Sequence, residues 1–172
     1  IAVGAGDRRV CPSHAALDSV VPRGEAAPAP SKGGEMAGTS GPCYIALGGN
    51  LGDRLRYLSA AWRRLAGLAG VRVRQSSSLY TTAPQYVTDQ PAFLNAVVEV
   101  ELSADRLGHL QGLMADLKAI EEDLGRTPGV RRGPRVVDLD IVAVGESKLS
   151  APGGPFPLEV PHALMHERDF VL

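Results

Sequence analysis

The sequence predicts an α+β fold of the ferredoxin-like type, a βαββαβ sandwich with a mixed, mainly antiparallel sheet and its helices packed on one face. Apolar runs rich in β-branched residues alternate along the chain with two long amphipathic segments, in the order strand, helix, strand, strand, helix, strand. Right-handed crossover connections place both helices on the same face of the sheet. The other face is therefore expected to be open.

The first half of the predicted domain holds two strands and one helix. Residues 43–47 form a short apolar run bounded by a proline and a pair of glycines, which predicts a buried strand ending in a tight turn. Asn50 or Asp53 can cap the helix that follows, which runs to about Ala66. Residues 71–80 alternate between apolar and polar side chains and predict a second strand. The helix has one apolar stripe, formed by Leu51, Leu55, Leu58, Trp62 and Leu65.

The second half begins with the clearest alternation in the chain. In residues 93–102 every second side chain is apolar and faces the core, so Phe93 and Asn95 are expected to lie together on the opposite face. A helix is predicted over residues 105–124, with Gly125 as its stop signal. A last strand follows after an arginine-rich loop.

Composition limits the classes of function. The 172 residues are 44% hydrophobic and 22% charged with a net charge of −1, which predicts a globular domain and gives no reason to expect a nucleic acid or membrane partner. The two cysteines, Cys11 and Cys43, have neither zinc-site nor disulfide-framework spacing. Residues 1–42 are rich in Gly, Ala, Pro and Ser and are expected to be a disordered extension, either a linker or a targeting segment. Residues 43–172 are expected to form the folded domain, truncated at its carboxyl end.

Two carboxylates stand one residue apart on the last predicted strand. The strand period of two puts Asp138 and Asp140 on one face and Leu139 on the other. This arrangement suits a Mg²⁺ site. One or two carboxylates and substrate phosphates would hold the ion, and arginines would bind the remaining phosphate oxygens, so such a site needs both the negative and the positive side chains found here. From these residues alone, a solvated strand edge with a salt-bridged loop is an equally good interpretation. Without a metal the carboxylates would repel each other, so neutralising one is expected to be neutral or slightly stabilising.

Several motifs follow one another in a fixed order along the chain. Residues 46–54 read Ala-Leu-Gly-Gly-Asn-Leu-Gly-Asp-Arg, residues 89–96 read Asp-Gln-Pro-Ala-Phe-Leu-Asn-Ala, and residues 133–141 read Gly-Pro-Arg-Val-Val-Asp-Leu-Asp-Ile. Shorter matches are Ser-Leu-Tyr at 78–80, Ile-Glu at 120–121 with Gly-Arg at 125–126, and Pro-His at 161–162 with Arg-Asp-Phe-Val-Leu at 168–172. Together they resemble the 6-hydroxymethyl-7,8-dihydropterin pyrophosphokinase family of folate biosynthesis over residues 44–172.

The resemblance implies transfer of the β,γ-diphosphate of ATP to the hydroxymethyl oxygen of the pterin, with ATP as co-substrate and two Mg²⁺ ions as cofactors. The metal ligands that it implies are Asp138 and Asp140. The catalytic residues that it implies are Arg126, Arg135, Asp138 and Asp140. The ATP-binding residues that it implies are Glu121, Arg126, Arg131, Arg135, His162 and Arg168. The pterin-binding residues that it implies are Thr82, Pro84, Phe93, Asn95 and Phe170, with the two phenylalanine rings on either side of the bicycle.

The sequence also departs from the family pattern. Arg132 stands where the family usually has an aromatic residue, residues 127–130 are one residue shorter than the loop of some members, and Ala163 stands where others carry Tyr or Pro. The loops at residues 81–90 and 125–133 are expected to close over bound ligands.

The sequences of two motifs, at residues 87–91 and 166–168, are most similar to those of plant-type members of the family. That resemblance implies a mitochondrial location if the chain is plant-type, and otherwise a cytoplasmic one, and a possible fused dihydropteroate synthase domain downstream. Two alternatives remain open at this point: another DxD metal-dependent nucleotidyl or glycosyl transferase, and a non-catalytic nucleotide-binding ferredoxin-like module. The sequence holds no Walker motif and no Gly-x-Gly-x-x-Gly, which disfavours P-loop and Rossmann enzymes.

Overall fold

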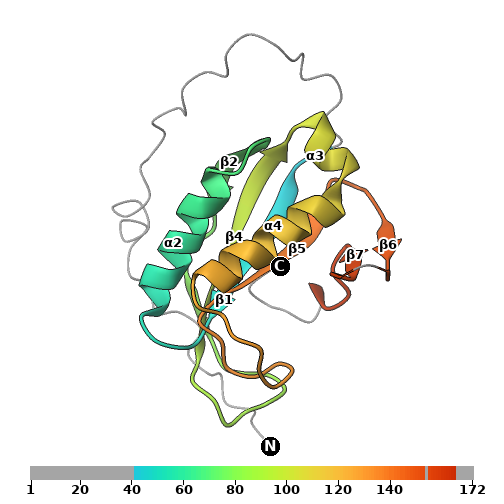
Figure 1. Cartoon of the computed structure of the whole chain (residues 1–172). Coiled ribbons are helices and arrows are strands. Elements are labelled where there is room, and N and C mark those ends of the chain that lie inside the picture. The colour runs from blue at the N-terminus through green and yellow to red at the C-terminus, as the bar shows by residue number, and fades with distance from the viewer. Residues whose placement is uncertain (1–40, 154, 166–172) are drawn as a thin grey trace, which may run out of the picture.

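The computed structural model describes residues 41–153 and 155–165, which form an α+β domain with helices on one face of an antiparallel sheet (Figure 1). The order of the main strands is β2-β4-β1-β5, and β3 pairs with the start of β4. The first strand therefore lies between the long strand and the last strand, as in a ferredoxin-like sandwich, which confirms the predicted fold class. The strands of this sheet are β1 (Cys43–Gly49), β2 (Val71–Ser76), β3 (Tyr80–Thr82), β4 (Phe93–Leu102) and β5 (Asp138–Val144).

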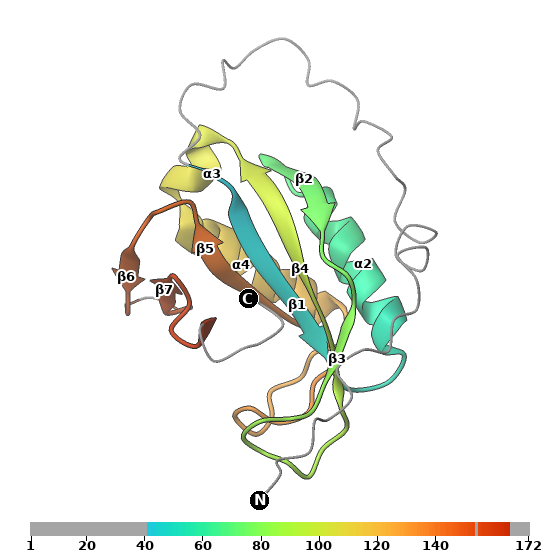
Figure 2. The ribbon, with the colours of Figure 1, turned by 180° about the vertical axis from the view of Figure 1, so that it is seen from behind.

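In the described part of the chain three helices pack on the sheet: α2 (Arg54–Ala66), α3 (Ala104–Gly108) and α4 (Leu110–Asp123). Figure 2 shows the opposite face of the sheet without a helix over it, as predicted. The core lies between the two layers, and each large apolar side chain buried there contributes roughly 1.5–3 kcal/mol. Fully buried members of this core are Ile45, Leu47, Leu58, Leu65, Val98, Val100, Leu113, Leu117, Leu139 and Ile141.

Two predicted elements are each divided in the structure. The helix expected over residues 105–124 is broken at His109, which has φ −131° and ψ 54° and separates α3 from α4. The strand expected over residues 71–80 is interrupted after β2, because the hydroxyl of Ser77 accepts a hydrogen bond from the N–H of Val97 at 2.9 Å. A side chain there takes the place of a backbone partner, so the strand ladder stops and resumes at β3.

The start of α2 also differs in one detail from the prediction. Asp53 is the residue that caps the helix, since its carboxylate accepts from the N–H of Arg56 at 3.1 Å. Leu51 precedes the helix and is 36% exposed, so it does not belong to the buried stripe. Leu58 and Leu65 do lie in the core.

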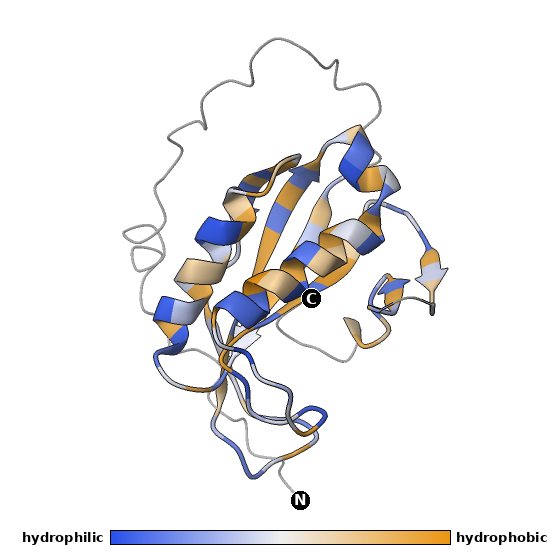
Figure 3. Cartoon of the chain, in the orientation of Figure 1, coloured by the Kyte–Doolittle hydropathy of each residue, from blue (hydrophilic) through white to orange (hydrophobic). Residues whose placement is uncertain are grey.

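A hairpin of β6 (Leu149–Ala151) and β7 (Leu158–Val160) lies beside the outer edge of β5. The N–H of His162, just after β7, donates to the carbonyl of Val142 in β5 at 2.8 Å. Figure 3 shows hydrophobic bands along the strands and largely hydrophilic loops at the end of the sheet where β1 stops. In the part of the chain that the structure describes, none of the helices combines the length and apolar character needed to cross a bilayer.

Candidate active site

Asp138 and Asp140 lie on the face of the sheet that the helices leave open. The strand register places Asp138 opposite Gly48 of β1, and Gly48 opposite Asn95 of β4. These three residues form one row across three strands, so the Cα atoms of Asp138 and Asn95 are roughly 10 Å apart. A Cβ atom at Gly48 would lie only 2.5 Å from Oδ1 of Asn95. At Gly48, therefore, no side chain stands between the carboxylate of Asp138 and the amide of Asn95. The row also confirms that Asp138 and Asn95 share one face of the sheet.

A Schellman motif at the end of α4 fixes Arg126 beside Glu121. The N–H of Gly125 donates to the carbonyl of Glu122, and the N–H of Arg126 donates to the carbonyl of Glu121, both at 2.9 Å. Gly125 has φ +92°, a conformation that strongly favours glycine. The turn directs Arg126 toward the acidic pair, where its Nη1 donates to both Oε2 of Glu121 and Oδ1 of Asp138.

Among the described residues, three cations surround Asp138. Besides the hydrogen bond from Arg126, Nη2 of Arg135 lies 2.8 Å from Oδ2 and Nζ of Lys118 lies 3.9 Å from Oδ1. Burial would raise the pKa of Asp138, but the charges of these cations outweigh it and hold the pKa below the ordinary value. The sequence-based expectation that neutralising this carboxylate is neutral or slightly stabilising rested on uncompensated repulsion. Because the charge of Asp138 is compensated, we now expect its neutralisation to destabilise the fold.

Side chains of α4 close the outer edge of β5. Oε1 of Glu121 accepts from the N–H of Leu139 at 2.6 Å, and Nζ of Lys118 donates to the carbonyl of Leu139 at 2.8 Å. Lys118 also lies 2.7 Å from Oε1 of Glu121 and 3.4 Å from Oδ1 of Asp140.

The surroundings of Glu121 and Lys118 shift the pKa of both groups. Burial raises the pKa of Glu121, which is only 2% exposed, and the neighbouring charge of Lys118 opposes that effect without cancelling it. Burial would lower the pKa of Lys118, but the carboxylates around it outweigh burial and raise the pKa. The sequence analysis missed Lys118, and the signal that could have found it is its spacing of three residues from Glu121 on one helix face.

Three of the predicted pterin residues, Thr82, Phe93 and Asn95, gather where β3 meets the start of β4. Thr82 is paired with Phe93, and Nδ2 of the buried Asn95 donates to Oγ1 of Thr82 at 2.8 Å. The guanidinium of Arg135 lies 5.1 Å from the centroid of the Phe93 ring, so Arg135 connects this aromatic group to the acidic pair. Pro84 is half-buried just after β3.

Asn50 joins the two loops that flank the site, and the sequence analysis assigned it only as a possible helix cap. Its Oδ1 accepts from the N–H of Arg135 at 2.8 Å, while its Nδ2 donates to the carbonyl of Pro91 at 2.9 Å and to Oε1 of Gln90 at 3.0 Å. Asn50 is 3% exposed, and these partners lie 40 to 85 residues away in sequence. Contacts at such separations leave no local pattern that periodicity could detect.

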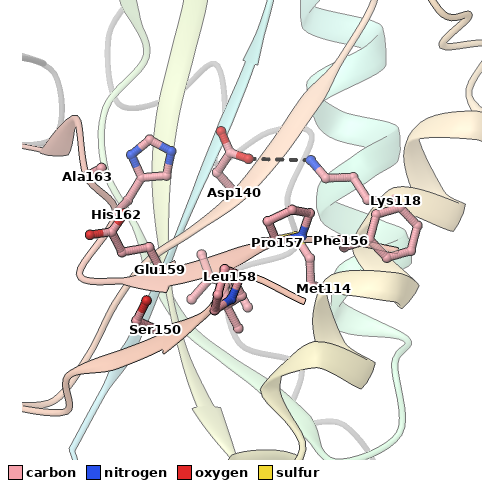
Figure 4. Close-up of a pocket in the computed structure, with 12 residues that line it drawn as sticks. Met114, Lys118, Asp140, Ser150, Phe156, Pro157, Leu158, Glu159, His162 and Ala163 are labelled. Carbon is pink, nitrogen blue, oxygen red and sulfur yellow. Dashed lines mark hydrogen bonds and ion pairs between the residues drawn. The ribbon is translucent and has the colours of Figure 1, made fainter. Parts of the chain in front are cut away.

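A pocket of about 380 Å³ opens between α4, β5 and the β6–β7 hairpin. Figure 4 shows the Lys118 ammonium group against the Asp140 carboxylate at its wall, with His162 also facing the pocket. Nδ1 of His162 accepts from the N–H of Leu164 at 3.2 Å, which orients the ring. The apolar part of the lining consists of Met114, Ile141, Pro152, Phe156, Pro157, Leu158 and Ala163.

The predicted site residues thus fall into groups. Glu121, Arg126, Arg135, Asp138 and Asp140 form one connected cluster together with Lys118. Arg131 is exposed on the loop between α4 and β5. Arg168 and Phe170 lie outside the described residues, as do residues 1–40 of the predicted extension.

Fold and site together define an α+β domain in which an acidic pair and two arginines meet at one end of an open sheet face, beside a largely apolar pocket. The chain belongs to the family described as 7,8-dihydro-6-hydroxymethylpterin-pyrophosphokinase, whose model matches residues 44–172. The family resemblance read from the motifs is thereby confirmed.

Named relatives agree with the family. The chain is 43% identical over 144 residues to the mitochondrial folate synthesis bifunctional protein of Pisum sativum, covering 84% of this chain and 26% of the pea protein. It is 43% identical over 138 residues to the protein of the same name from Arabidopsis thaliana, covering 80% of this chain and 23% of that one. It is also 43% identical over 129 residues to the 2-amino-4-hydroxy-6-hydroxymethyldihydropteridine pyrophosphokinase of Bacillus subtilis, covering 75% and 72% of the two chains. The chain therefore spans only about a quarter of the two plant relatives.

Proposed function

We propose that this domain transfers the β,γ-diphosphate of ATP to the hydroxymethyl group of 6-hydroxymethyl-7,8-dihydropterin. The observation that carries the proposal is the row of Asp138, Gly48 and Asn95, because it aligns a charged group for phosphates with an amide for a heterocycle on one face. The Bacillus subtilis relative, of which the chain covers 72%, is named for this activity.

The pocket beside α4 suits the nucleotide. A volume of about 380 Å³ with a largely apolar lining fits a flat purine base, since ligand pockets are mostly apolar with a few placed polar groups. Lys118, Asp140 and His162 lie at its wall, so the phosphates would extend from the pocket toward Arg126 and Arg135. Nε of Arg135 is buried and has no acceptor among the described residues, which leaves a donor available to an anionic ligand.

The donor set also fits two Mg²⁺ ions held by Asp138 and Asp140. Magnesium is usually bound by one or two carboxylates plus substrate phosphates rather than by a cage made only of protein groups. No group of three or more potential metal-binding side chains occurs among the described residues, so a Mg²⁺ ion held by Asp138 and Asp140 would need the substrate phosphates to complete its coordination. Bound Mg²⁺ would supply charge neutralisation for the transferring phosphates.

The pterin would lie over the row on the open face. Phe93 offers a flat apolar surface for stacking, and the amide of Asn95 can read a donor and acceptor edge of the bicycle. The hydrogen bond from Asn95 to Thr82 fixes the amide, so its carbonyl oxygen remains directed over Gly48. Phe170 is proposed as the second stacking ring.

In the reaction the hydroxymethyl oxygen forms a bond to the β-phosphorus of ATP, while the bond between that phosphorus and the oxygen bridging to the α-phosphate breaks. AMP leaves with the bridging oxygen, and the hydroxyl proton is released. Such transfers depend mainly on positioning and on electrostatic stabilisation. Arg126 and Arg135 are proposed to stabilise the transferring group, and Glu121 is proposed to orient Arg126 by accepting a hydrogen bond from its Nη1. Arg131, His162 and Arg168 are proposed as further nucleotide contacts.

The wider setting of the domain is also a proposal. We propose that residues 43–172 belong to a catalytic domain preceded by an extension at 1–42, and that a dihydropteroate synthase domain follows in the same polypeptide. The word bifunctional in the names of the two plant relatives supports a fused domain, and their mitochondrial designation supports a mitochondrial location.

The test is the identity of the nucleotide product. The chain is incubated with ATP, Mg²⁺ and 6-hydroxymethyl-7,8-dihydropterin, and nucleotides are separated by chromatography. Pterin-dependent formation of AMP is expected. Formation of ADP, or of AMP at an equal rate without pterin, would contradict the proposed diphosphate transfer.

A further inference from the structure

We propose that Lys118 is a positioning residue that makes metal binding at the acidic pair depend on the nucleotide. The inference rests on the proposed function, because it concerns how Asp138 and Asp140 receive Mg²⁺. In this arrangement the Lys118 ammonium group balances the acidic pair when no nucleotide is bound and keeps its place when the nucleotide arrives.

The anchoring of Lys118 distinguishes it from the two arginines of the cluster. Its two shortest contacts, 2.7 Å to Glu121 and 2.8 Å to the carbonyl of Leu139, go to groups that are not the proposed metal ligands. Its contacts with the proposed ligands are longer, 3.4 Å to Asp140 and 3.9 Å to Asp138. An ammonium group has three donors, and two of them are engaged independently of the metal ligands.

The arginines are placed differently. Arg126 and Arg135 extend from the loop between α4 and β5, and their side chains contact Asp138 directly. The side chain of Lys118 is 19% exposed, compared with 22% for Arg135 and 30% for Arg126. The arginines can exchange Asp138 for phosphate oxygens of the nucleotide. Arg126 shares the contact with Glu121, but Lys118 extends from a helix and also donates to the β5 backbone at Leu139, which holds it in place.

The charges of the cluster are balanced. Among the described residues its carboxylates are Glu121, Asp138 and Asp140 and its cations are Lys118, Arg126 and Arg135, so the formal charges of these groups cancel. A divalent cation that approaches without a nucleotide meets a neutral cluster with a fixed ammonium group beside Asp140. A nucleotide brings negative phosphates that draw the arginines away and favour the metal, so metal and nucleotide bind together.

The experiment measures Mn²⁺, used in place of Mg²⁺, by electron paramagnetic resonance on the 172-residue chain without nucleotide. Lys118→Met keeps the aliphatic stem and removes the charge. It is expected to tighten Mn²⁺ binding about fivefold to tenfold, because one unit of nearby repulsion is lost in a partly solvated site. Lys118→Arg keeps the charge and is expected to restore the weak binding of the parent chain. Lys148→Met, which removes an exposed lysine outside the pocket, is the matched control and is expected to change nothing.

A second variant, Lys118→Gln, retains a donor for the Leu139 carbonyl, so the test survives if the methionine variant does not fold. A purely structural role for Lys118 would lower the thermal midpoint of both variants and leave Mn²⁺ affinity within twofold of the parent chain, and that result overturns the inference. Failure of the proposed function is a separate result: the parent chain would then bind no Mn²⁺ in the presence of a non-hydrolysable ATP analogue and would form no pterin-dependent AMP.

Discussion

The guanidinium group of Arg132 lies over the ring of Tyr86, 3.7 Å from its centroid, and this contact joins the two loops that flank the candidate site. A second link comes from Gln90, whose Nε2 donates to the carbonyl of Arg132 at 3.0 Å. Arg132 has φ +62°, which is unfavourable for a residue with a side chain. The loops are therefore held together by a residue in a strained conformation.

Replacing Arg132 with glycine should loosen the contact between the two loops without lowering the stability of the fold. The substitution relieves about 1 kcal/mol of backbone strain and removes an exposed cation–π contact worth about 0.5–1 kcal/mol, so the thermal midpoint should change little or rise. Amide hydrogen exchange in residues 83–92 and 125–135 should become faster. Tyr86→Leu removes the stack without changing the backbone, so it should speed exchange with no gain in midpoint. Unchanged exchange in both variants would mean that the stack does not hold the loops.

Gly125→Ala tests whether the turn after α4 places Arg126. No atom lies within 4 Å of a Cβ built at Gly125, so the effect of alanine comes from φ +92° alone. A loss of about 1 kcal/mol in the free energy of unfolding is expected, together with a clear fall in kcat for AMP formation. Gly129→Ala is the matched control, because it lies in the same loop and also has open space around its Cβ. Equal kcat values in the two variants would show that Arg126 does not depend on this turn.

Asp138→Asn and Asp140→Asn should differ in stability while both lose activity. Asp138 is surrounded by three cations, so its neutralisation should cost about 1–3 kcal/mol at neutral pH. Asp140 lies 3.4 Å from Lys118 and is 20% exposed, so its neutralisation should cost less, about 0–1 kcal/mol. Turnover should fall by about 10²–10³ in each variant, because a preorganised charge is lost. Activity that only follows the folded fraction would identify the pair as structural.

The pH dependence gives a further check on Asp138. Its folded-state pKa is lowered, so the charged form contributes stability above the unfolded-state pKa of about 3.9. That contribution is lost as the pH falls through the folded-state pKa. The difference in unfolding free energy between the parent chain and Asp138→Asn should therefore shrink from about pH 4 downward, measured by urea unfolding. A constant difference would contradict the proposed compensation of its charge.

Cys43 should make stability fall at alkaline pH. It is 1% exposed in β1, and burial raises the pKa of its thiol to about 12. In the unfolded chain the thiol ionises at a lower pH, so the folded state binds the proton more tightly and stability falls as the pH rises above about 9, by at most about 1.4 kcal/mol per pH unit. Urea unfolding between pH 8 and 10.5 should show a steeper decline for the parent chain than for Cys43→Ala. Parallel declines would show that the thiol is not the cause.

Sequence patterns predicted the layers of the fold because burial repeats along each element. The alternation of residues 93–102 and the spacing of Asp138 and Asp140 placed Asn95 and the acidic pair on one face, and the strand register agrees. The break at His109 was not predicted, because the apolar stripe continues across it. Hydrophobic periodicity indicates which face of a helix or strand is buried, but it does not reveal a local change in backbone direction.

The residues that hold the site together by hydrogen bonds were harder to predict than the residues proposed to bind metal and phosphate. Asn50 carries no chemistry that marks it in the sequence, and the spacing of Lys118 from Glu121 marks only a pair on one helix face. Each residue acquires its place in the site from groups that the folded chain brings near. Asn50 meets Arg135 from 85 residues away, and Lys118 meets the backbone of Leu139 from 21 residues away. Such residues orient others, and sequence reasoning from metal or phosphate ligands alone does not reach them.

The closed edge of β5 has a consequence for self-association. A strand at the border of a sheet normally presents unpaired backbone groups on which a strand of another molecule can assemble. Here the N–H and carbonyl of Leu139 bond to Glu121 and Lys118, and the carbonyl of Val142 bonds to His162. Residues that serve the candidate active site thus also protect the border of the sheet, so their loss would expose a template for aggregation at the same position where it disables the chemistry.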